Sequence, residues 1–327
     1  MRVVYMGTPE FAVPSLEALI GRKAHDVAGI VTGPDRPRGR GLKTGSSPVK
    51  DAALRHGIPL WQPDKLRDPS FLDVLRALKA DLFVVVAFRI LPAVLLEIPP
   101  GGAVNLHPSL LPRHRGAAPI QWAVMSGDEV TGVTTFLIEK QVDAGDILCQ
   151  ETVPIGPEET AGELHDRLSH IGADLLLRTV DLVAAGGIRP RPQQGEVSPA
   201  PRLSREDGRI DWRLPARAIH NRVRGLNPVP MAFTSWRGKN LRILTSRTVS
   251  LEGTGGLQPG RIVYADERRG IVVQTGEGGL RLDRVQPEGR GRIEAAEFVR
   301  GYRPAAGDLF GARDPRSESS ARNRDHG

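Results

Sequence analysis

Short apolar runs alternate with stretches of helical spacing through the first half of the chain. Residues 3–6 form a strand-like run, and apolar residues three or four apart follow it over 11–20. Residues 27–32 and 81–87 are further runs typical of buried strands, and the second of these follows a helix-spaced stretch over 71–78. Repeated strand and helix units of this kind predict an α/β domain built on an open, mainly parallel sheet.

We expect this first domain to occupy residues 1–187 and to end with a long amphipathic helix. Residues 188–204 are rich in proline and glutamine, which predicts an extended linker. Over 205–310, short strands between glycine turns predict a small all-β domain, an OB-like barrel. Residues 311–327 lack periodicity, which predicts a disordered tail. The strands expected in the second domain are 231–234, 241–244, 260–263, 270–274 and 280–285.

Composition is that of an ordinary folded protein, with 39% hydrophobic and 25% charged residues. No apolar run is long enough to span a bilayer, and Met1 leads directly into the first strand, so we expect a cytoplasmic protein. Residues 1–200 carry 21 Lys and Arg against 23 Asp and Glu, whereas residues 201–300 carry 19 against 11. The basic second domain indicates an anionic partner, with nucleic acid the leading candidate and a GC-rich genome the alternative explanation.

A basic, glycine-rich connection over residues 33–47 also fits a nucleic-acid partner. It is long for an α/β unit, in which about two to six residues usually join a strand to a helix. Its cations are candidate phosphate contacts, and its glycines let the backbone move. The alternative is a solvated, flexible loop. The predicted contacts to RNA in this loop are Arg36, Arg38, Arg40 and Lys43.

Candidate chemistry gathers at the end of another predicted strand. Asn105 and His107 are two residues apart, so their side chains leave a strand on the same face. Pro108 and Pro112 then stop the strand and stiffen the turn, although a strand end with ordinary polar residues is the alternative. Asp143 lies in a polar turn after the next strand, where a carboxylate can orient or charge a histidine, or simply form an Asx turn.

An amide donor, an imidazole and a carboxylate, with no serine or cysteine nucleophile among them, suit direct acyl transfer to an amine. The amine attacks a carbonyl carbon, and Asn105 and protonated His107 donate hydrogen bonds to the developing oxyanion. Asp143 raises the proton affinity of the imidazole and is a candidate acceptor for the amine proton. We expect no metal, because no further His or Cys lies at ligand spacing.

These residues resemble the folate-dependent formyltransferases, and among them the enzymes that act on methionyl-tRNA. The resemblance is carried by residues 105–112, 115–121 and 143–146, and it covers the chain from about residue 3 to residue 303. Further matching segments are 7–11, 34–37, 39–41, 47–50, 208–212 and 224–228.

The resemblance implies a Rossmann-like catalytic domain that binds 10-formyltetrahydrofolate as formyl donor, and an OB-like domain that grips initiator methionyl-tRNA. It implies Asn105, His107 and Asp143 as catalytic residues, in a cytoplasmic enzyme of translation initiation that we expect to be a monomer. It places the loop around Arg40 in the acceptor end of the tRNA. The folate contacts expected on this basis are Ser109, Leu110, Leu111, Pro112, Phe88, Arg89 and Ile90.

Two alternatives remain. One is a formyltransferase that acts on a small amine such as glycinamide ribonucleotide, and this chain is closer to that enzyme at residues 88–91. That enzyme normally has a phosphate cradle after the first strand, which Gly7-Thr8-Pro9 does not provide. It also lacks a basic barrel domain. The other is a tRNA-binding protein on an inactive α/β domain. It is disfavoured because all three candidate catalytic residues are present.

Overall fold

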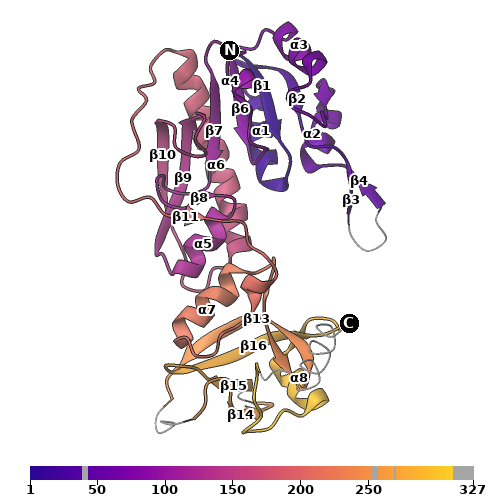
Figure 1. Ribbon diagram of the computed structural model, residues 1–327, viewed down its shortest axis with the longest axis vertical. Helices are drawn as coiled ribbons and strands as arrows, with labels where there is room; N and C mark the ends of the chain where they lie inside the picture. Colours follow the sequence, from indigo (N-terminus) through magenta and orange to yellow (C-terminus); the bar gives the residue numbers. More distant parts are fainter. Residues whose placement is uncertain (39–42, 252–256, 269, 312–327) are drawn as a thin grey trace, which may run out of the picture. The chain divides into compact units, whose positions relative to one another are not determined.

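The computed structural model describes residues 1–38, 43–251, 257–268 and 270–311, and the chain divides into two compact units (Figure 1). The first comprises Met1–Ile120, Glu129–Ile155 and Glu163–Pro201; the second comprises Gln121–Asp128, Gly156–Gly162 and the described residues from Arg202 onward. In the described part of the chain, no helix has both the length and the apolar character needed to cross a membrane. Arg40 and residues 312–327 of the predicted tail lie outside the described residues.

The first unit is built on one seven-stranded sheet, in the order β10-β9-β7-β6-β1-β2-β5. The five strands from β7 to β5 in that order are parallel, and β9 and β10 run antiparallel at one edge. This confirms the predicted open α/β sheet. The strands are β1 (Arg2–Gly7), β2 (Asp26–Val31), β5 (Leu60–Trp61), β6 (Leu82–Val86), β7 (Ala103–His107), β9 (Val130–Leu137) and β10 (Ile147–Pro154).

Helices cover both faces of this sheet. On one face, α3 (Pro69–Ala77) and α4 (Ala93–Leu96) pack on alternate strand residues such as Val4 and Phe83. On the other, the Tyr5 hydroxyl donates to the carbonyl of Ala12 beside α1, and Gly172 of α6 lies against Leu106. Because strand side chains alternate between faces, β7 directs Asn105 and His107 to the α3 and α4 face, with Ala103. The helices outside that face are α1 (Val13–Gly21), α2 (Pro48–His56), α5 (Pro119–Ser126) and α6 (Ala161–Ala184).

The basic connection begins as a hairpin. The strands β3 (Arg36–Arg38) and β4 (Lys43–Gly45) pair antiparallel, with Arg38 opposite Lys43. At its base, Lys50 and Gln62 both bind the carboxylate of Asp35, and the hydrogen bond to Lys50 lowers the pKa of that carboxyl. The described ends of the predicted loop are therefore ordered backbone anchored to the first unit.

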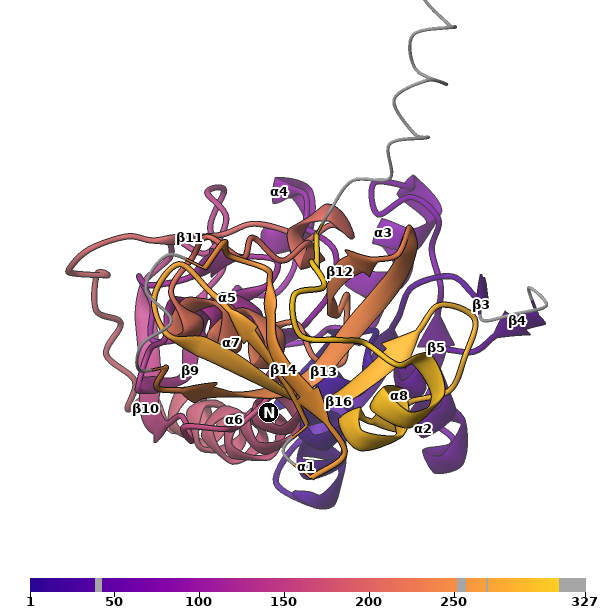
Figure 2. The same ribbon diagram turned by 90° about the horizontal axis from the view of Figure 1, so that it is seen from below.

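The second unit is an antiparallel sheet in the order β12-β13-β16-β15-β14, with β17 paired to β16. All five predicted strands are present, which confirms an antiparallel β domain after the α/β domain. Two helices pack on the sheet, α7 (Ala216–Gly225) on β13 and α8 (Ala295–Tyr302) on β15 and β16 (Figure 2). The strands are β12 (Ala232–Trp236), β13 (Lys239–Val249), β14 (Ile262–Asp266), β15 (Gly270–Gln274), β16 (Gly279–Pro287) and β17 (Ile293–Glu294).

The sequence did not indicate α8, which begins with a capping box. Glu294 and Glu297 exchange hydrogen bonds between their side chains and the opposite backbone N–H groups. The helix then buries Phe298, which packs edge-on against Trp236 at a centroid distance of 5.2 Å. The core of the second unit therefore combines strand and helix side chains.

Residues 188–201 belong to the first unit, whereas the sequence predicts a linker over 188–204. We name this segment the strap. Its Arg191 exchanges backbone hydrogen bonds with Ile147, and its short strand β11 (Pro199–Ala200) pairs in parallel with β8 (Arg115–Gly116). The strap has the extended backbone expected of a linker, but its polar groups bond to the sheet domain.

Candidate active site

Asn105 and His107 lie at the end of β7, between the parallel strand β6 and the antiparallel strand β9. His107 ends the strand and is 4% exposed, and Asn105 is half-buried. Within the part of the chain that the structure describes, no hydrogen-bond partner of the Asn105 side chain is present. The carboxyl ends of parallel strands are where ligands bind in open α/β sheets, so the Asn105 amide is a donor placed at a binding edge.

The turn after β7 is held by its own polar groups. The buried Ser109 hydroxyl donates to the carbonyl of Arg113 at 2.6 Å, and Thr134 on β9 donates to the Ser109 carbonyl at 2.6 Å. Gln150 on β10 donates to the carbonyl of Leu111 at 2.9 Å. Ser109, Leu111 and Pro112 are buried, and Leu110 is half-buried. The structure therefore gives these side chains a part in fixing the turn, and their contact with folate stays a prediction.

His107 is held by one ring nitrogen and faces a carboxylate with the other. Its Nε2 lies 2.9 Å from the carbonyl oxygen of His114, and its Nδ1 lies 3.8 Å from Oδ2 of Asp143. Because a carbonyl oxygen only accepts, Nε2 carries a hydrogen and the neutral ring keeps its lone pair on Nδ1. Burial lowers the pKa of His107, against the opposing effect of Asp143. The imidazole is therefore a neutral base whose protonated form has a nearby counter-ion.

Asp143 reaches His107 from the turn between β9 and β10. Its backbone is left-handed, with φ of 52°, and its Oδ2 accepts a hydrogen bond of 2.9 Å from the N–H of Gly116. The side chain of Gln193 donates to the carbonyls of Asp143 and Gly145, each at 2.9 Å. The structure thus brings Asp143, which is distant in sequence, beside His107 at the end of the strand that also carries Asn105.

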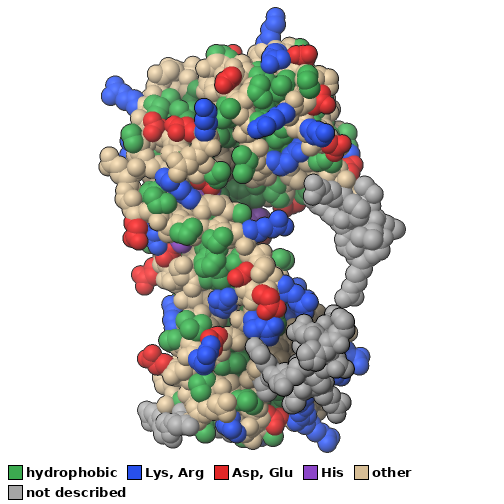
Figure 3. Space-filling view, in the orientation of Figure 1, with side chains coloured by type: hydrophobic (Ala, Val, Ile, Leu, Met, Phe, Trp, Pro, Cys, Tyr) green, Lys and Arg blue, Asp and Glu red, His purple; other side chains and the backbone are tan. Residues whose placement is uncertain are grey.

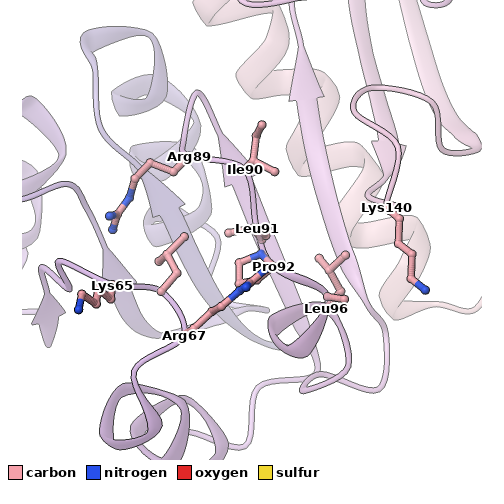
Figure 4. A pocket seen from close by; sticks show the side chains of 10 residues that line it. Lys65, Arg67, Arg89, Ile90, Leu91, Pro92, Leu96 and Lys140 are labelled. Carbon is pink, nitrogen blue, oxygen red and sulfur yellow. The ribbon is translucent and has the colours of Figure 1, made fainter.

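An open pocket of about 570 Å³ lies at the α3 and α4 face, beyond β6 (Figure 4). Apolar side chains of the loop after β6 and of α4 line it together with cations from three separate segments. Of the predicted folate contacts, Arg89 and Ile90 line this pocket; among the described residues, Phe88 and the turn after β7 are not part of its lining. The lining residues are Lys65, Leu66, Arg67, Arg89, Ile90, Leu91, Pro92, Ala93, Leu96 and Lys140.

Arg89 links two sides of this pocket. Its guanidinium donates to the carbonyls of Pro63 and Asp64, at 2.7 and 3.0 Å, and lies 5.2 Å from the centroid of the Phe88 ring. These contacts tie the loop after β6 to the loop that carries Lys65 and Arg67. Sequence reasoning missed these two cations, because they lie in a short loop without a recognisable spacing.

Two family models match the chain. The model described as formyl transferase matches residues 1–180, and that of the formyl transferase C-terminal domain matches residues 202–303. A methionyl-tRNA formyltransferase from Moorella thermoacetica is 48% identical over 313 residues, covering 95% of this chain and 99% of the relative. The chain belongs to the formyl transferase family. A second methionyl-tRNA formyltransferase, from Syntrophus aciditrophicus, is 46% identical over 311 residues, covering 94% of this chain and 98% of the relative, so the resemblance found in the sequence is confirmed.

Solved structures of other proteins share the fold. An N-formyltransferase from Helicobacter canadensis, in complex with folinic acid and dTDP-3-aminofucose, has a TM-score of 0.64 and 17% identity, covering 87% of this chain and 98% of that one. HypX from Aquifex aeolicus in complex with tetrahydrofolic acid has a TM-score of 0.61 and 18% identity over 96% of this chain. The chain spans about half of HypX, 51% of its length, and at these identities the likeness concerns the fold alone.

Three of the four predicted RNA contacts fall on the β3 and β4 hairpin, and the fourth lies outside the described residues. Arg36, Arg38 and Lys43 are backbone positions of the two hairpin strands, and Arg40 lies outside the described residues. Lys and Arg side chains also occur over the face of the second unit seen in Figure 3. Several of its arginines are paired with carboxylates, such as Arg213 with Asp211 at 2.7 Å. Contact of the hairpin with RNA stays a prediction.

Proposed function

We propose that this formyl transferase moves a formyl group from 10-formyltetrahydrofolate to the amino group of methionine on initiator methionyl-tRNA. The identity with methionyl-tRNA formyltransferases over nearly the full chain supports the substrate pair. The single structural observation that carries the chemistry is the Asp143 carboxylate at 3.8 Å from Nδ1 of His107, at the end of the strand that also carries Asn105. We expect the enzyme to act in the cytoplasm, as a monomer and without a metal.

The chemistry proposed for the chain uses each group in turn. The methionyl amine attacks the formyl carbon, and the Asn105 amide donates to the oxyanion of the tetrahedral intermediate, a contact worth on the order of 3–4 kcal/mol. Nδ1 of His107 accepts the proton that the amine loses, and Asp143 stabilises the resulting imidazolium, whose charge also favours the oxyanion. The imidazolium then returns the proton to the leaving nitrogen of the folate. The formyl group passes directly from the folate to the amine, and the proton passes through His107 to the leaving nitrogen, so no covalent enzyme intermediate is needed.

The open pocket fits a folate by its chemistry. Leu91, Pro92 and Leu96 offer apolar surface to an aromatic ring system, and Lys65, Arg67 and Lys140 offer positive charge to the carboxylates of its glutamate tail. Arg89 would hold the pocket walls together, and the proposed role of Phe88 is to support Arg89. The contacts predicted for residues 109–112 would come from the shape of the turn after β7.

The decisive experiment supplies 10-formyltetrahydrofolate with charged initiator methionyl-tRNA, and compares elongator methionyl-tRNA and glycinamide ribonucleotide as acceptors. We expect rapid formylation of the initiator species only. Formylation of the ribonucleotide alone would replace the proposed acceptor by a small amine. Binding of tRNA without any formyl transfer would favour the inactive-domain alternative.

The hairpin proposal has its own test. Arg40→Ala should raise the KM for initiator tRNA far more than the KM for the folate, because a lost phosphate contact weakens only the RNA complex. Lys23→Ala, which removes an exposed positive charge on the same unit, is the control. An equal rise in the KM for both substrates would instead indicate that the loop has a structural role.

A further inference from the structure

The strap (residues 188–201) contacts each element that fixes the His107 and Asp143 pair. Ser198 accepts a hydrogen bond of 2.9 Å from the N–H of His114, the residue whose carbonyl binds His107. Ser198 also accepts from the N–H of Arg115 at 2.9 Å. The strand β11 then lies against Gly116, whose N–H binds Asp143. The histidine side of the pair is therefore backed by strap residues 198–200.

Gln193 makes the corresponding contact on the carboxylate side. Its Nε2 donates one hydrogen to the carbonyl of Asp143 and one to that of Gly145, at 2.9 Å each. Its Oε1 accepts from Nε and Nη2 of Arg115, at 3.2 and 2.6 Å. Both hydrogens and both lone pairs of the amide are used, so only one orientation of the side chain satisfies its neighbours. This half-buried side chain thus connects the loop that carries Asp143 to the segment that carries Arg115 through four hydrogen bonds.

The loop that carries Asp143 has a conformation that its surroundings must stabilise. Asp143 has a left-handed backbone, which costs a non-glycine residue free energy unless its surroundings impose it. Gly145 packs so closely that a Cβ there would lie 1.8 Å from the carbonyl oxygen of Leu137. Among the described residues, the carboxylate itself accepts one hydrogen bond, from the N–H of Gly116. The orientation of the Asp143 carboxylate toward Nδ1 of His107 therefore depends on the path of the loop.

We propose that Gln193 is a positioning residue of the active site: its amide fixes the loop that carries Asp143 and so keeps the carboxylate facing Nδ1 of His107. This inference rests on the proposed function, which assigns His107 and Asp143 their catalytic roles. Gln193 touches neither reacting group, so its effect on formyl transfer passes through Asp143. Because the strap continues into the second unit at Arg202, the segment that joins the two units also completes the site.

The experiment uses the full chain with Gln193→Met, which keeps the side-chain length and removes the hydrogen bonds without adding a charge. Gln194→Met is the matched control, because Gln194 is exposed and makes no side-chain hydrogen bond to the described residues. We expect Gln193→Met to lower kcat about tenfold or more, to leave both KM values within about threefold, and to keep a cooperative thermal transition. Gln193→Glu keeps the acceptor for Arg115 and loses the two donors, so it should be as slow as Gln193→Met.

Two measurements separate positioning from a general structural role. The first is a double-mutant cycle: in an Asp143→Asn background, Gln193→Met should have little further effect on kcat, because the group it positions is gone. The second follows the NMR titration of the His107 ring, assigned with His107→Gln. Burial lowers the pKa of His107, Asp143 and the hydrogen bond to the His114 carbonyl raise it, and the charge of His114 lowers it. A released Asp143 loop should therefore lower the pKa of His107 in Gln193→Met but not in Gln194→Met.

An unchanged His107 titration, or an equal loss of kcat in the Asp143→Asn background, would overturn the positioning role. If the wild-type protein formylates none of the acceptors, the proposed function fails, and the titration still decides whether Gln193 positions the pair.

Discussion

In each unit, a buried histidine with a lowered pKa lies beside a carboxylate. In the first, Nδ1 of His107 is 3.8 Å from Asp143; in the second, Nε2 of His220 is 3.7 Å from Glu158. Both residues are at most 4% exposed, and burial is the largest cause lowering the pKa of each. The two histidines are alike in their own burial, in their distance to a carboxylate and in the direction of their pKa shift, so none of these properties distinguishes a catalytic histidine.

Their surroundings differ. His220 lies on α7 and its ring contacts Ser246 and the carbonyl of Pro157, at 3.3 and 3.5 Å. Its carboxylate partner, Glu158, is 64% exposed, so solvent screens the pair, whereas the Asp143 side chain is 13% exposed. His107 shares a strand face with the Asn105 amide at the carboxyl edge of the sheet. A donor and a sheltered carboxylate at a binding edge make His107, and not His220, the candidate base.

The largest effect expected is on chemistry at His107. His107→Ala or Asp143→Ala should lower the single-turnover rate of formyl transfer at least about a hundredfold, because the proton acceptor or its counter-ion is lost. His220→Ala and Glu158→Ala are the matched changes in the other unit and should leave the rate within about threefold. Near-normal turnover after either change in the first unit would end the proposed mechanism.

A smaller effect is expected on stability. His220→Ala should lower the free energy of unfolding by about 1–3 kcal/mol, because it leaves a gap in a buried region and removes a partner of Ser246. Urea unfolding followed by circular dichroism measures this change. Loss of formyl transfer in a folded His220→Ala protein would contradict the contrast between the two histidines.

The smallest effect is the response of stability to pH. Both histidines have pKa values below that of an unfolded histidine, about 6.5, so the unfolded chain binds more protons in the interval between. Their contribution to stability is therefore complete above about pH 6.5 and falls as the pH drops through the folded pKa values. Replacing both with Gln should flatten the fall in urea midpoint between pH 7.5 and 5.5. An unchanged slope would show that other groups dominate.

Much of the architecture was predictable because it follows from local patterns. Apolar runs such as residues 81–87 predict buried strands, since a parallel strand covered on both faces excludes polar side chains. The short strands of the second unit were visible for a related reason, because glycine turns separate them. The helix α8 was not, because its capping box uses Glu294 and Glu297, which are common residues on any surface.

The candidate chemistry divides in the same way. The sequence by itself determined the residue types of the site and that Asn105 and His107 share a face, because a strand alternates its side chains. Only the tertiary structure decided which nitrogen of His107 faces Asp143, and that Gln193 holds the Asp143 loop from fifty residues away. The strap has the composition of a linker, and nothing local marks one glutamine in it. A hydrogen bond between distant segments depends on the path of the whole chain, which no short window of sequence contains.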